Sequence, residues 1–499
     1  MSEKKFRFPT QTFLQLVNLF QPSTIRYSRR VFVNRNLRMA KIQAVGFDMD
    51  YTLAIYNQKI DALEFELTAR RLVEKHGFPQ VALGFKYDPE FAIRGLVIDM
   101  ELGNIFKMDR HRHVCRACHG TRIVEPEQRN ALYRKKLIRL SKPVYSLIDT
   151  LFSVPETHLY ALAVDLLDRT GQSTPEAYQN VYRAIRDSAD EIHRDGTLKK
   201  VVMADLARYV ERDLDIAHTL EHLICSGKKL FIVTNSGWDY TDAMMSFLLD
   251  GVVASFPRWT DFFSVVVVDA RKPDFFAHRA RLRPCPQAGG DLAPKVYCGG
   301  SLTGLEIELA ASGDNILYVG DHIYGDILRS KKSSTWRTAM IIPEMESELE
   351  STEAVREDLL KLDRLFLKRN DLNVELNYLQ RLLMSLLNIQ DLASHNGNGH
   401  ETAEPLSQVA RVTESNVAAL KESLEKLART MEKTEFAILS RFNPHWGMLF
   451  KEGMSHTVFG EQVEDYACLY TSRITNFLSY SPLHYFQAAR DKLAHERDE

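Results

Sequence analysis

The chain has 499 residues, of which 45% are hydrophobic and 26% charged, an ordinary balance for a globular protein of several domains. Its 64 basic and 66 acidic residues nearly cancel, so we expect neither nucleic acid nor a membrane surface as a partner. No run of 18 apolar residues suggests a membrane span, and six scattered cysteines fit a reducing cytoplasm.

Residues 1–40 are polar and basic, and we interpret them as an N-terminal extension that packs on the core, without a signal peptide. The next segment, 41–54, reads KIQAVGFDMDYTLA. Its apolar run predicts a buried strand of a parallel sheet that ends in Asp48 and Asp50. Open α/β sheets build their sites at such strand ends, although paired acids also cap helices or lie on solvated turns.

The following segments predict helices with one hairpin among them. Residues 64–76 have helical spacing and end before Gly77, a typical C-cap residue. Residues 96–99 and 105–107 indicate a hairpin. Residues 125–225 are rich in helical patterns, which indicates a mostly helical insertion that covers the site as a cap.

A short motif between these segments combines thiols and imidazoles. Cys115, Cys118 and His119 follow His111 and His113 in the string DRHRHVCRACH, which could be a haem-attachment string or half of a zinc site. We interpret it as a basic surface loop with incidental thiols, and the sequence leaves metal binding there open.

Three more apolar runs each end in polar residues. The run at 227–233 leads into Thr234 and Asn235, and the run at 261–269 leads towards Lys272. The run at 316–319 leads into Asp321, with Asp326 five residues later. Four strand ends of matching chemistry are stronger evidence than any single motif.

The chain changes character after residue 343, where two leucine-rich stripes predict a pair of long helices. Residues 394–408 indicate a loop joining an antiparallel helix pair, and we expect the stripes to pack on each other rather than on another subunit. The segment 466–486 is aromatic-rich and is expected to pack on the core. The stripes are Leu372, Leu376, Leu379, Leu383 and Leu386, and Val417, Leu420, Leu424, Leu427 and Met431.

The four strand ends suit phosphoryl transfer, which needs several charge-stabilising groups in one place. Asp48 would attack phosphorus and Asp50 would act as the general acid and base. Mg²⁺ would offset the repulsion between a phosphate and a cluster that includes Asp48 and Asp321.

The remaining groups would bind the phosphoryl oxygens. Thr234 and Asn235 would donate hydrogen bonds, and Lys272 would stabilise negative charge in the transition state. Each has an ordinary explanation when taken alone, since a single lysine is usually solvated and a Thr-Asn-Ser run often caps a helix.

The motifs GFDMDYTLA, FAIRGLV, VTNS, VDARKP and YVGDHIYGDIL, the last followed by Ser330, Lys331 and Lys332, resemble the cytosolic purine 5'-nucleotidases of the haloacid-dehalogenase-like superfamily. The resemblance implies Asp48 as nucleophile, Asp50 as acid and base, and Asp326 in support. It also implies Mg²⁺ held by Asp48, Asp321 and the backbone carbonyl of Asp50.

The resemblance and the patterns together give an α/β fold. We expect a Rossmann-like parallel-sheet core over residues 41–65 and 221–345, a mostly helical cap over 66–220, and a helical C-terminal region over 346–499. The resemblance also implies phosphotransfer to a nucleoside acceptor, a nucleotide effector, and a homo-oligomer, specifically a tetramer.

Arg186, Asp190 and His193 lie on one helical face and could recognise a 6-oxopurine base, as the resemblance also implies. Phe152 could stack on the base, and Lys199 completes the expected substrate-binding set. The residues alone favour a different interpretation, in which Arg186 and Asp190 form a surface ion pair.

The sequence departs from the family pattern in the expected base pocket, at Arg194, Asp149 and Ser153. Two other functions remain as alternatives, a sugar-phosphate phosphatase with the same loops and a non-catalytic scaffold. Five intact polar residues at the strand ends argue against the scaffold.

Overall fold

The computed structural model describes residues 25–277, 279–289, 295–328, 334–395, 400–490 and 496. It divides into two compact units, one formed by residues up to Ser347 together with those from Leu449 on, and the other by Glu348–Met448. Residues 1–24 and 330–332, for which we made predictions, lie outside the described residues.

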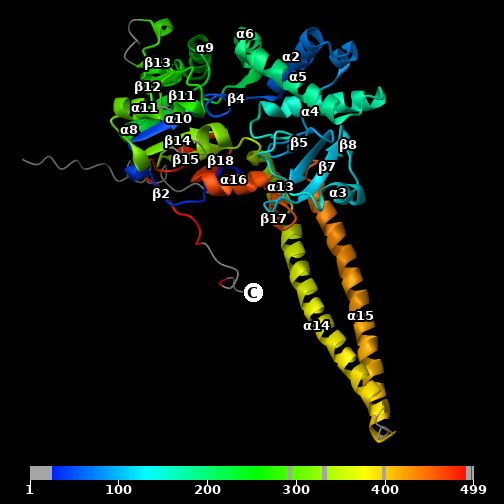
Figure 1. The fold of residues 1–499 in the computed structure, drawn as a ribbon. Coiled ribbons are helices and arrows are strands. Elements are labelled where there is room, and N and C mark those ends of the chain that lie inside the picture. The colour runs from blue at the N-terminus through cyan, green and yellow to red at the C-terminus, as the bar shows by residue number, and fades with distance from the viewer. Residues whose placement is uncertain are drawn as a thin grey trace, which may run out of the picture. The chain divides into compact units, whose positions relative to one another are not determined.

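An eight-stranded sheet forms the centre of the first unit, and all of its neighbouring strands are parallel except β1 and β18 (Figure 1). The strands, in order across the sheet, are β1 (Phe32–Val33), β18 (Leu469–Thr471), β15 (Arg337–Ile341), β14 (Ile316–Gly320), β3 (Ala44–Phe47), β11 (Lys229–Val233), β12 (Val265–Val268) and β13 (Val296–Cys298).

The continuous apolar runs are explained by burial of both faces of this sheet. In β11, Leu230 and Ile232 belong to one core cluster, whereas Phe231 and Val233 belong to the cluster on the other face. The strands β3, β11, β12 and β14 lie within the four predicted apolar segments, except that Gly320 extends β14 by one residue. The predicted parallel core is confirmed.

Helices connect and cover the strands of the first unit (Figure 1). The helix expected at 64–76 is confirmed but begins earlier, and it ends before Gly77, whose φ is 66°. The helices are α2 (Gln58–His76), α3 (Pro126–Tyr133), α4 (Ser153–Arg169), α5 (Pro175–Arg194), α6 (Thr197–Ala204), α7 (Leu206–Tyr209), α8 (Asp215–Cys225), α9 (Trp238–Leu249), α10 (Asp274–Ala277), α11 (Leu302–Leu309) and α16 (Val458–Tyr466).

A second, antiparallel sheet of five strands lies within the region expected to be a mostly helical cap. The predicted hairpin is part of it, and its other strands come from segments too short or too polar to show a clear alternation. In order, the strands are β8 (Arg122–Ile123), β7 (Val114–His119), β6 (Asn104–Met108), β5 (Val97–Asp99) and β9 (Tyr145–Leu147).

The Cys115-x-x-Cys118-His119 string forms β7, so the expectation of a surface loop there was wrong. Cys118 is buried, and His119 contacts Asn104 and Asp168 through its two ring nitrogens at 2.8 Å each. The string alternates too little between apolar and polar residues to indicate a strand, which is why sequence reasoning missed it.

Both ends of the chain contribute to the first unit. Val31, Leu37 and Met39 from the N-terminal extension are buried in the core, and Ile474, Phe477 and Phe486 confirm the packing expected for 466–486. The region from 346 is not wholly helical, since it supplies β18 to the main sheet.

Three two-stranded pairs complete this unit: β4 (Ile55–Tyr56) with β10 (Val210–Glu211), β2 (Leu37–Arg38) with β19 (Tyr485–Phe486), and β16 (Lys451–Glu452) with β17 (Ser455–His456).

The second unit is a hairpin of two long helices, α14 (Arg356–His395) and α15 (His400–Leu439), which pack on each other. Helix α13 (Met345–Ala354) precedes them. The loop expected over 394–408 was too long, because the helices leave only residues 396–399 between them, outside the described residues. Leu386, Val417, Leu427 and Met431 are buried, as the stripes predicted.

No described helix is long and apolar enough to cross a membrane.

Candidate active site

The predicted residues at the four strand ends meet at one edge of the main sheet. Strands β14, β3, β11 and β12 are neighbours and parallel, so their carboxyl ends lie side by side. A cavity of about 300 Å³ lies there. Its lining includes the following predicted residues: Asp48, Asp50, Phe152, Asn235, Lys272, Asp321 and Asp326.

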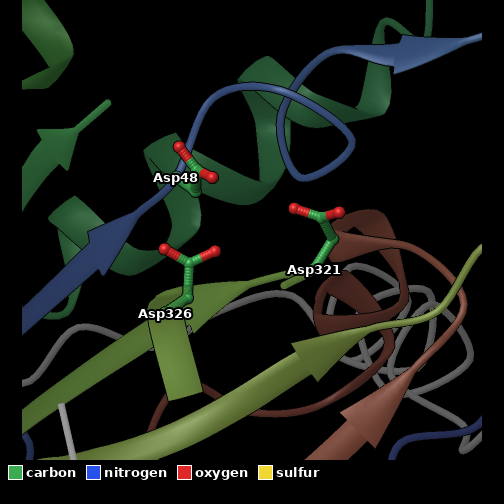
Figure 2. Close-up of side chains that lie close together, drawn as sticks. All are labelled: Asp48, Asp321 and Asp326. Carbon is green, nitrogen blue, oxygen red and sulfur yellow. The ribbon is translucent and has the colours of Figure 1, made fainter. Parts of the chain in front are cut away.

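Three carboxylates form a compact buried cluster in this cavity. One side-chain oxygen from each of Asp48, Asp321 and Asp326 lies within 4.8 Å of the other two. Figure 2 shows the three side chains close together. The Nζ atom of Lys272 lies 2.8 Å from Oδ1 of Asp48 and 2.7 Å from Oδ1 of Asp326. One ammonium beside three carboxylates leaves an excess of negative charge if all are ionised.

Burial and the neighbouring charges shift the pKa values of the acids and of Lys272. Burial raises the pKa of Asp48 well above its usual value, with Asp326 and Asp321 adding to the effect and Lys272 opposing it. Burial also raises the pKa of Asp321 to about 7, with Asp326 adding. Burial alone would lower the pKa of Lys272, but Asp326 and Asp48 raise it well above the usual value.

The donor set therefore fits a hard divalent cation. All three side chains offer carboxylate oxygens, which Mg²⁺ and Ca²⁺ prefer, and a cation would stabilise the ionised form that burial and repulsion disfavour. Asp326, expected only in a supporting role, is a member of the same cluster. Gly320 makes this possible, because a Cβ there would lie 2.7 Å from the Cβ of Asp326.

Asp50 lies beside the cluster and accepts two hydrogen bonds. The hydroxyl of Ser236 donates to its Oδ2 at 2.9 Å, and the hydroxyl of Tyr56 donates to its Oδ1. The Tyr56 hydroxyl also lies 2.9 Å from that of Tyr240. Sequence reasoning missed Tyr56, which lies two residues after the motif GFDMDYTLA, and gave Ser236 no role, although it ends the motif VTNS.

Thr234 and Asn235 hold the loops of the site. The Thr234 hydroxyl oxygen accepts from the Ser236 amide at 3.0 Å, which leaves its proton free to donate. The Asn235 side chain accepts from the Lys272 amide at 2.6 Å and donates to the Lys272 carbonyl at 3.2 Å. Asn235 thus fixes the backbone that carries the site's lysine.

Two further residues missed by sequence reasoning support the cluster. Arg94, fully buried, donates from Nη1 to the carbonyl of Asp321 at 2.8 Å and pairs with Glu344 through Nε and Nη2 at 2.7 and 2.6 Å. Tyr318 places its hydroxyl 3.3 Å from Nζ of Lys272 and donates to the carbonyl of Val233 at 3.1 Å. A charged residue within the apolar string FAIRGLV was the available signal for Arg94.

The expected base contacts adjoin the cavity rather than line it. Phe152 is the exception, and its ring lies 4.9 Å from that of Tyr51 and 5.1 Å from that of His193. The Nε2 atom of His193 lies 3.0 Å from Oε1 of Glu64. Lys199 donates to the Ser236 hydroxyl at 3.2 Å, next to Asp50.

Arg186 and Asp190 form the ion pair that the residues alone had favoured. Nη2 of Arg186 lies 2.6 Å from Oδ1 of Asp190, while Nη1 pairs with Glu156 at 2.7 Å and donates to Ser153 at 3.2 Å. Burial raises the pKa of Glu156 to about 7 even though Arg186 opposes the shift. The guanidinium is therefore held in place by three partners.

The departures from the family pattern differ in surroundings. Asp149 lies 3.6 Å from the ring of His322, which lines the cavity. Burial alone would raise the pKa of Asp149, but the hydrogen bond and charge of His322 outweigh it and lower the pKa. Arg194 is exposed at the end of α5.

Comparison with known proteins shows the family of the chain. The model of the 5' nucleotidase family matches residues 31–498, so the chain belongs to that family. It is a 5'-nucleotidase, an enzyme that hydrolyses nucleoside monophosphates. A similar curated protein is a 5'-nucleotidase domain-containing protein of Dictyostelium discoideum, 27% identical over 487 residues, which cover 93% of this chain and 74% of the relative.

Proposed function

We propose that the chain is a Mg²⁺-dependent 5'-nucleotidase of the haloacid-dehalogenase-like type that hydrolyses 6-oxopurine nucleoside 5'-monophosphates through an aspartyl-phosphate. The observation that carries the proposal is the buried cluster of Asp48, Asp321 and Asp326 around Lys272 at the carboxyl ends of adjacent parallel strands. Lys272 and a cation held by the carboxylates would stabilise negative charge on a phosphoryl group, and Asp48 would present a carboxylate oxygen to it.

The reaction is divided into two displacements. A carboxylate oxygen of Asp48 forms a bond to phosphorus as the bond to the 5' oxygen of the nucleoside breaks, and Asp50 donates a proton to that oxygen. Water then attacks the aspartyl-phosphate while Asp50 accepts its proton, which releases phosphate and restores both side chains. The Ser236 and Tyr56 hydroxyls hold the carboxyl group of Asp50 in place.

Two positive groups would balance the negative charge of the site in this proposal. Asp48, Asp321 and Asp326 would hold Mg²⁺, which supplies positive charge to offset repulsion between the carboxylates and the phosphate. Lys272 stabilises negative charge on the phosphoryl oxygens, and Asn235 positions its backbone.

A 6-oxopurine presents an acceptor at O6 and a donor at N1. We assign Arg186 to the first, Asp190 to the second and Phe152 to stacking on the base. In support, the Phe152 ring lines the cavity, and Ser153, its neighbour in sequence, accepts from Arg186. Adenine presents a donor at N6 and an acceptor at N1, the reverse of this pattern, so it would place a donor against Arg186 and an acceptor against Asp190 and bind less well.

The wider properties also belong to this proposal. They are phosphotransfer to a nucleoside acceptor, control by a nucleotide effector, a cytoplasmic location and a homotetramer, all of which rest on the resemblance stated above.

A substrate panel tests the proposal. Phosphate release is measured with inosine, guanosine and adenosine 5'-monophosphates and with hexose phosphates, with Mg²⁺ and with excess chelator. We expect hydrolysis of the two 6-oxopurine nucleotides at least about tenfold faster than of the others, and its loss with chelator. A preference for hexose phosphates, or full activity in chelator, would overturn the assignment.

A further inference from the structure

A second cavity lies against the five-stranded sheet and is lined mainly by cationic side chains. It has a volume of about 660 Å³ and lies between the turn before β7, helix α3 and the segment after α3. No carboxylate lines it among the described residues. The lining residues with basic side chains are His111, Arg112, His113, Arg129, Arg134, Lys135 and Lys136.

Several of these charges have no acidic partner. Lys136 lies 3.4 Å from Glu101, and Arg112 lies 3.4 Å from Glu461. No carboxylate of the described chain lies within ion-pair distance of Arg129, Arg134 or Lys135. Since Arg134 and Lys135 are exposed side by side at the end of α3, the cavity carries an excess of positive charge.

Two arginines that line the cavity, Arg112 and Arg129, also have hydrogen-bond donors without an acceptor among the described residues. Nη1 of Arg112 and Nε of Arg129 are covered, and no atom of the described residues accepts from them. Nη1 of Arg129 donates to the carbonyl of Cys115, which fixes its guanidinium against β7. Buried polar groups without a partner are unusual, so neither guanidinium is fully satisfied by the described residues.

The size and charge of the cavity select the class of ligand. A volume of about 660 Å³ is typical of a small-molecule site rather than of a surface that follows a nucleic-acid strand. Guanidinium and ammonium groups bind phosphate oxygens in preference to neutral groups. Three cations without acidic partners match a compact ligand with several negative charges.

We propose that this cavity is a second anion site, which binds a compact polyphosphate group through Arg129, Arg134 and Lys135. It shares no lining residue with the cavity that contains Asp48. The inference goes beyond the proposed function and does not depend on it.

Isothermal titration of the full chain with inorganic tripolyphosphate tests the site. The double variant Arg134→Gln/Lys135→Gln removes two exposed charges without breaking an ion pair, and it should weaken binding at least about tenfold. The matched control is Arg411→Gln/Lys421→Gln, which removes two exposed charges from α15 and should leave the affinity within about twofold. An equal loss in both variants would show general charge attraction and overturn the site.

Additional titrations identify the source of the polyphosphate and separate this site from the first one. A nucleoside triphosphate that binds more tightly than tripolyphosphate, with the same loss in the double variant, supports the site and shows that a base contributes. A single-stranded oligonucleotide that binds more tightly than either would overturn the proposal that the site binds a compact ligand. Nucleotide hydrolysis without added polyphosphate should be unchanged in the double variant, so this test and that of the proposed function fail independently.

Discussion

Lys272 is a buried residue whose ammonium pairs with two carboxylates of the candidate active site, Asp48 and Asp326. Its position depends on Asn235, which holds its backbone, and on Tyr318, which contacts its Nζ atom. The ion pairs of Lys272 leave the third acid, Asp321, without an ammonium partner in the cluster. Asp321 is also buried, and burial raises its pKa to about 7. Lys272 alone therefore leaves an excess of negative charge in the ionised cluster, and we propose that a bound cation offsets it.

Asp61, which lies outside the cluster, has a raised pKa that predicts a pH dependence of the free energy of unfolding. Asp61 lies in the first turn of α2 and accepts from the Tyr51 hydroxyl at 3.2 Å. Burial raises its pKa to about 7, with Glu64 adding. A folded-state pKa above the unfolded value means that its contribution to stability is full below about pH 4 and is lost as the pH rises through about 7.

Asp61→Asn removes this titration. We expect the free energy of unfolding of the wild type, relative to that of the variant, to fall by about 2 kcal/mol between about pH 5 and about pH 8. Urea unfolding at several pH values measures it, with Asp187→Asn on the exposed face of α5 as the control. Parallel stability curves for wild type and Asp61→Asn would contradict the assignment.

Sequence reasoning found the site residues that follow strands and missed those that act across the fold. Asp48, Asp321 and Lys272 each follow an apolar run, so local pattern placed them at a sheet edge. Arg94 acts on the carbonyl of a residue 227 positions away, and Tyr56 contacts a tyrosine 184 positions away. Contacts at such separations are set by tertiary packing, which no local pattern encodes.

Among the elements, β3 and β11 show how tightly the sheet must pack to align the strand ends. A Cβ at Gly46 would lie 2.1 Å from ring atoms of Phe231, a distance that atoms cannot adopt without movement. Both residues lie at the centre of the sheet, and Phe231 is fully buried. The glycine in the motif GFDMD therefore serves packing beneath the site.

Gly46→Ala should destabilise the first unit by about 1–3 kcal/mol, because overpacking a rigid core forces side chains and strands apart. The free energy of unfolding in urea measures it. Phe231→Leu in the same chain should restore part of the loss, since the shorter side chain makes room. A Gly46→Ala variant as stable as the wild type would show that β3 and β11 do not pack as described.

The elements themselves were predictable to different degrees. Long apolar runs buried on both faces gave the parallel strands, and two leucine-rich stripes gave the helical hairpin. The five-stranded sheet was missed apart from its first hairpin, because β8 and β9 have only two and three residues. β18 joins the main sheet 128 residues after β15 ends, and such a distant pairing leaves no local signal.

At the scale of the whole molecule, every proposed catalytic and substrate-binding residue lies in the first unit. The second unit, Glu348–Met448, contributes none. Replacing residues 356–439 by a short Gly/Ser linker should therefore leave kcat/KM for nucleotide hydrolysis within about twofold. Circular dichroism controls for folding, and a loss of more than about tenfold in a folded variant would assign the hairpin a part in the reaction.

The central claim is that the carboxylate of Asp48 attacks the phosphoryl group. Asp48→Asn keeps the size of the side chain but replaces the nucleophilic oxygen by an amide. Phosphate release from inosine or guanosine monophosphate should fall at least about a thousandfold in this variant, while circular dichroism remains that of the wild type. Release at the wild-type rate from a folded Asp48→Asn protein would contradict the account.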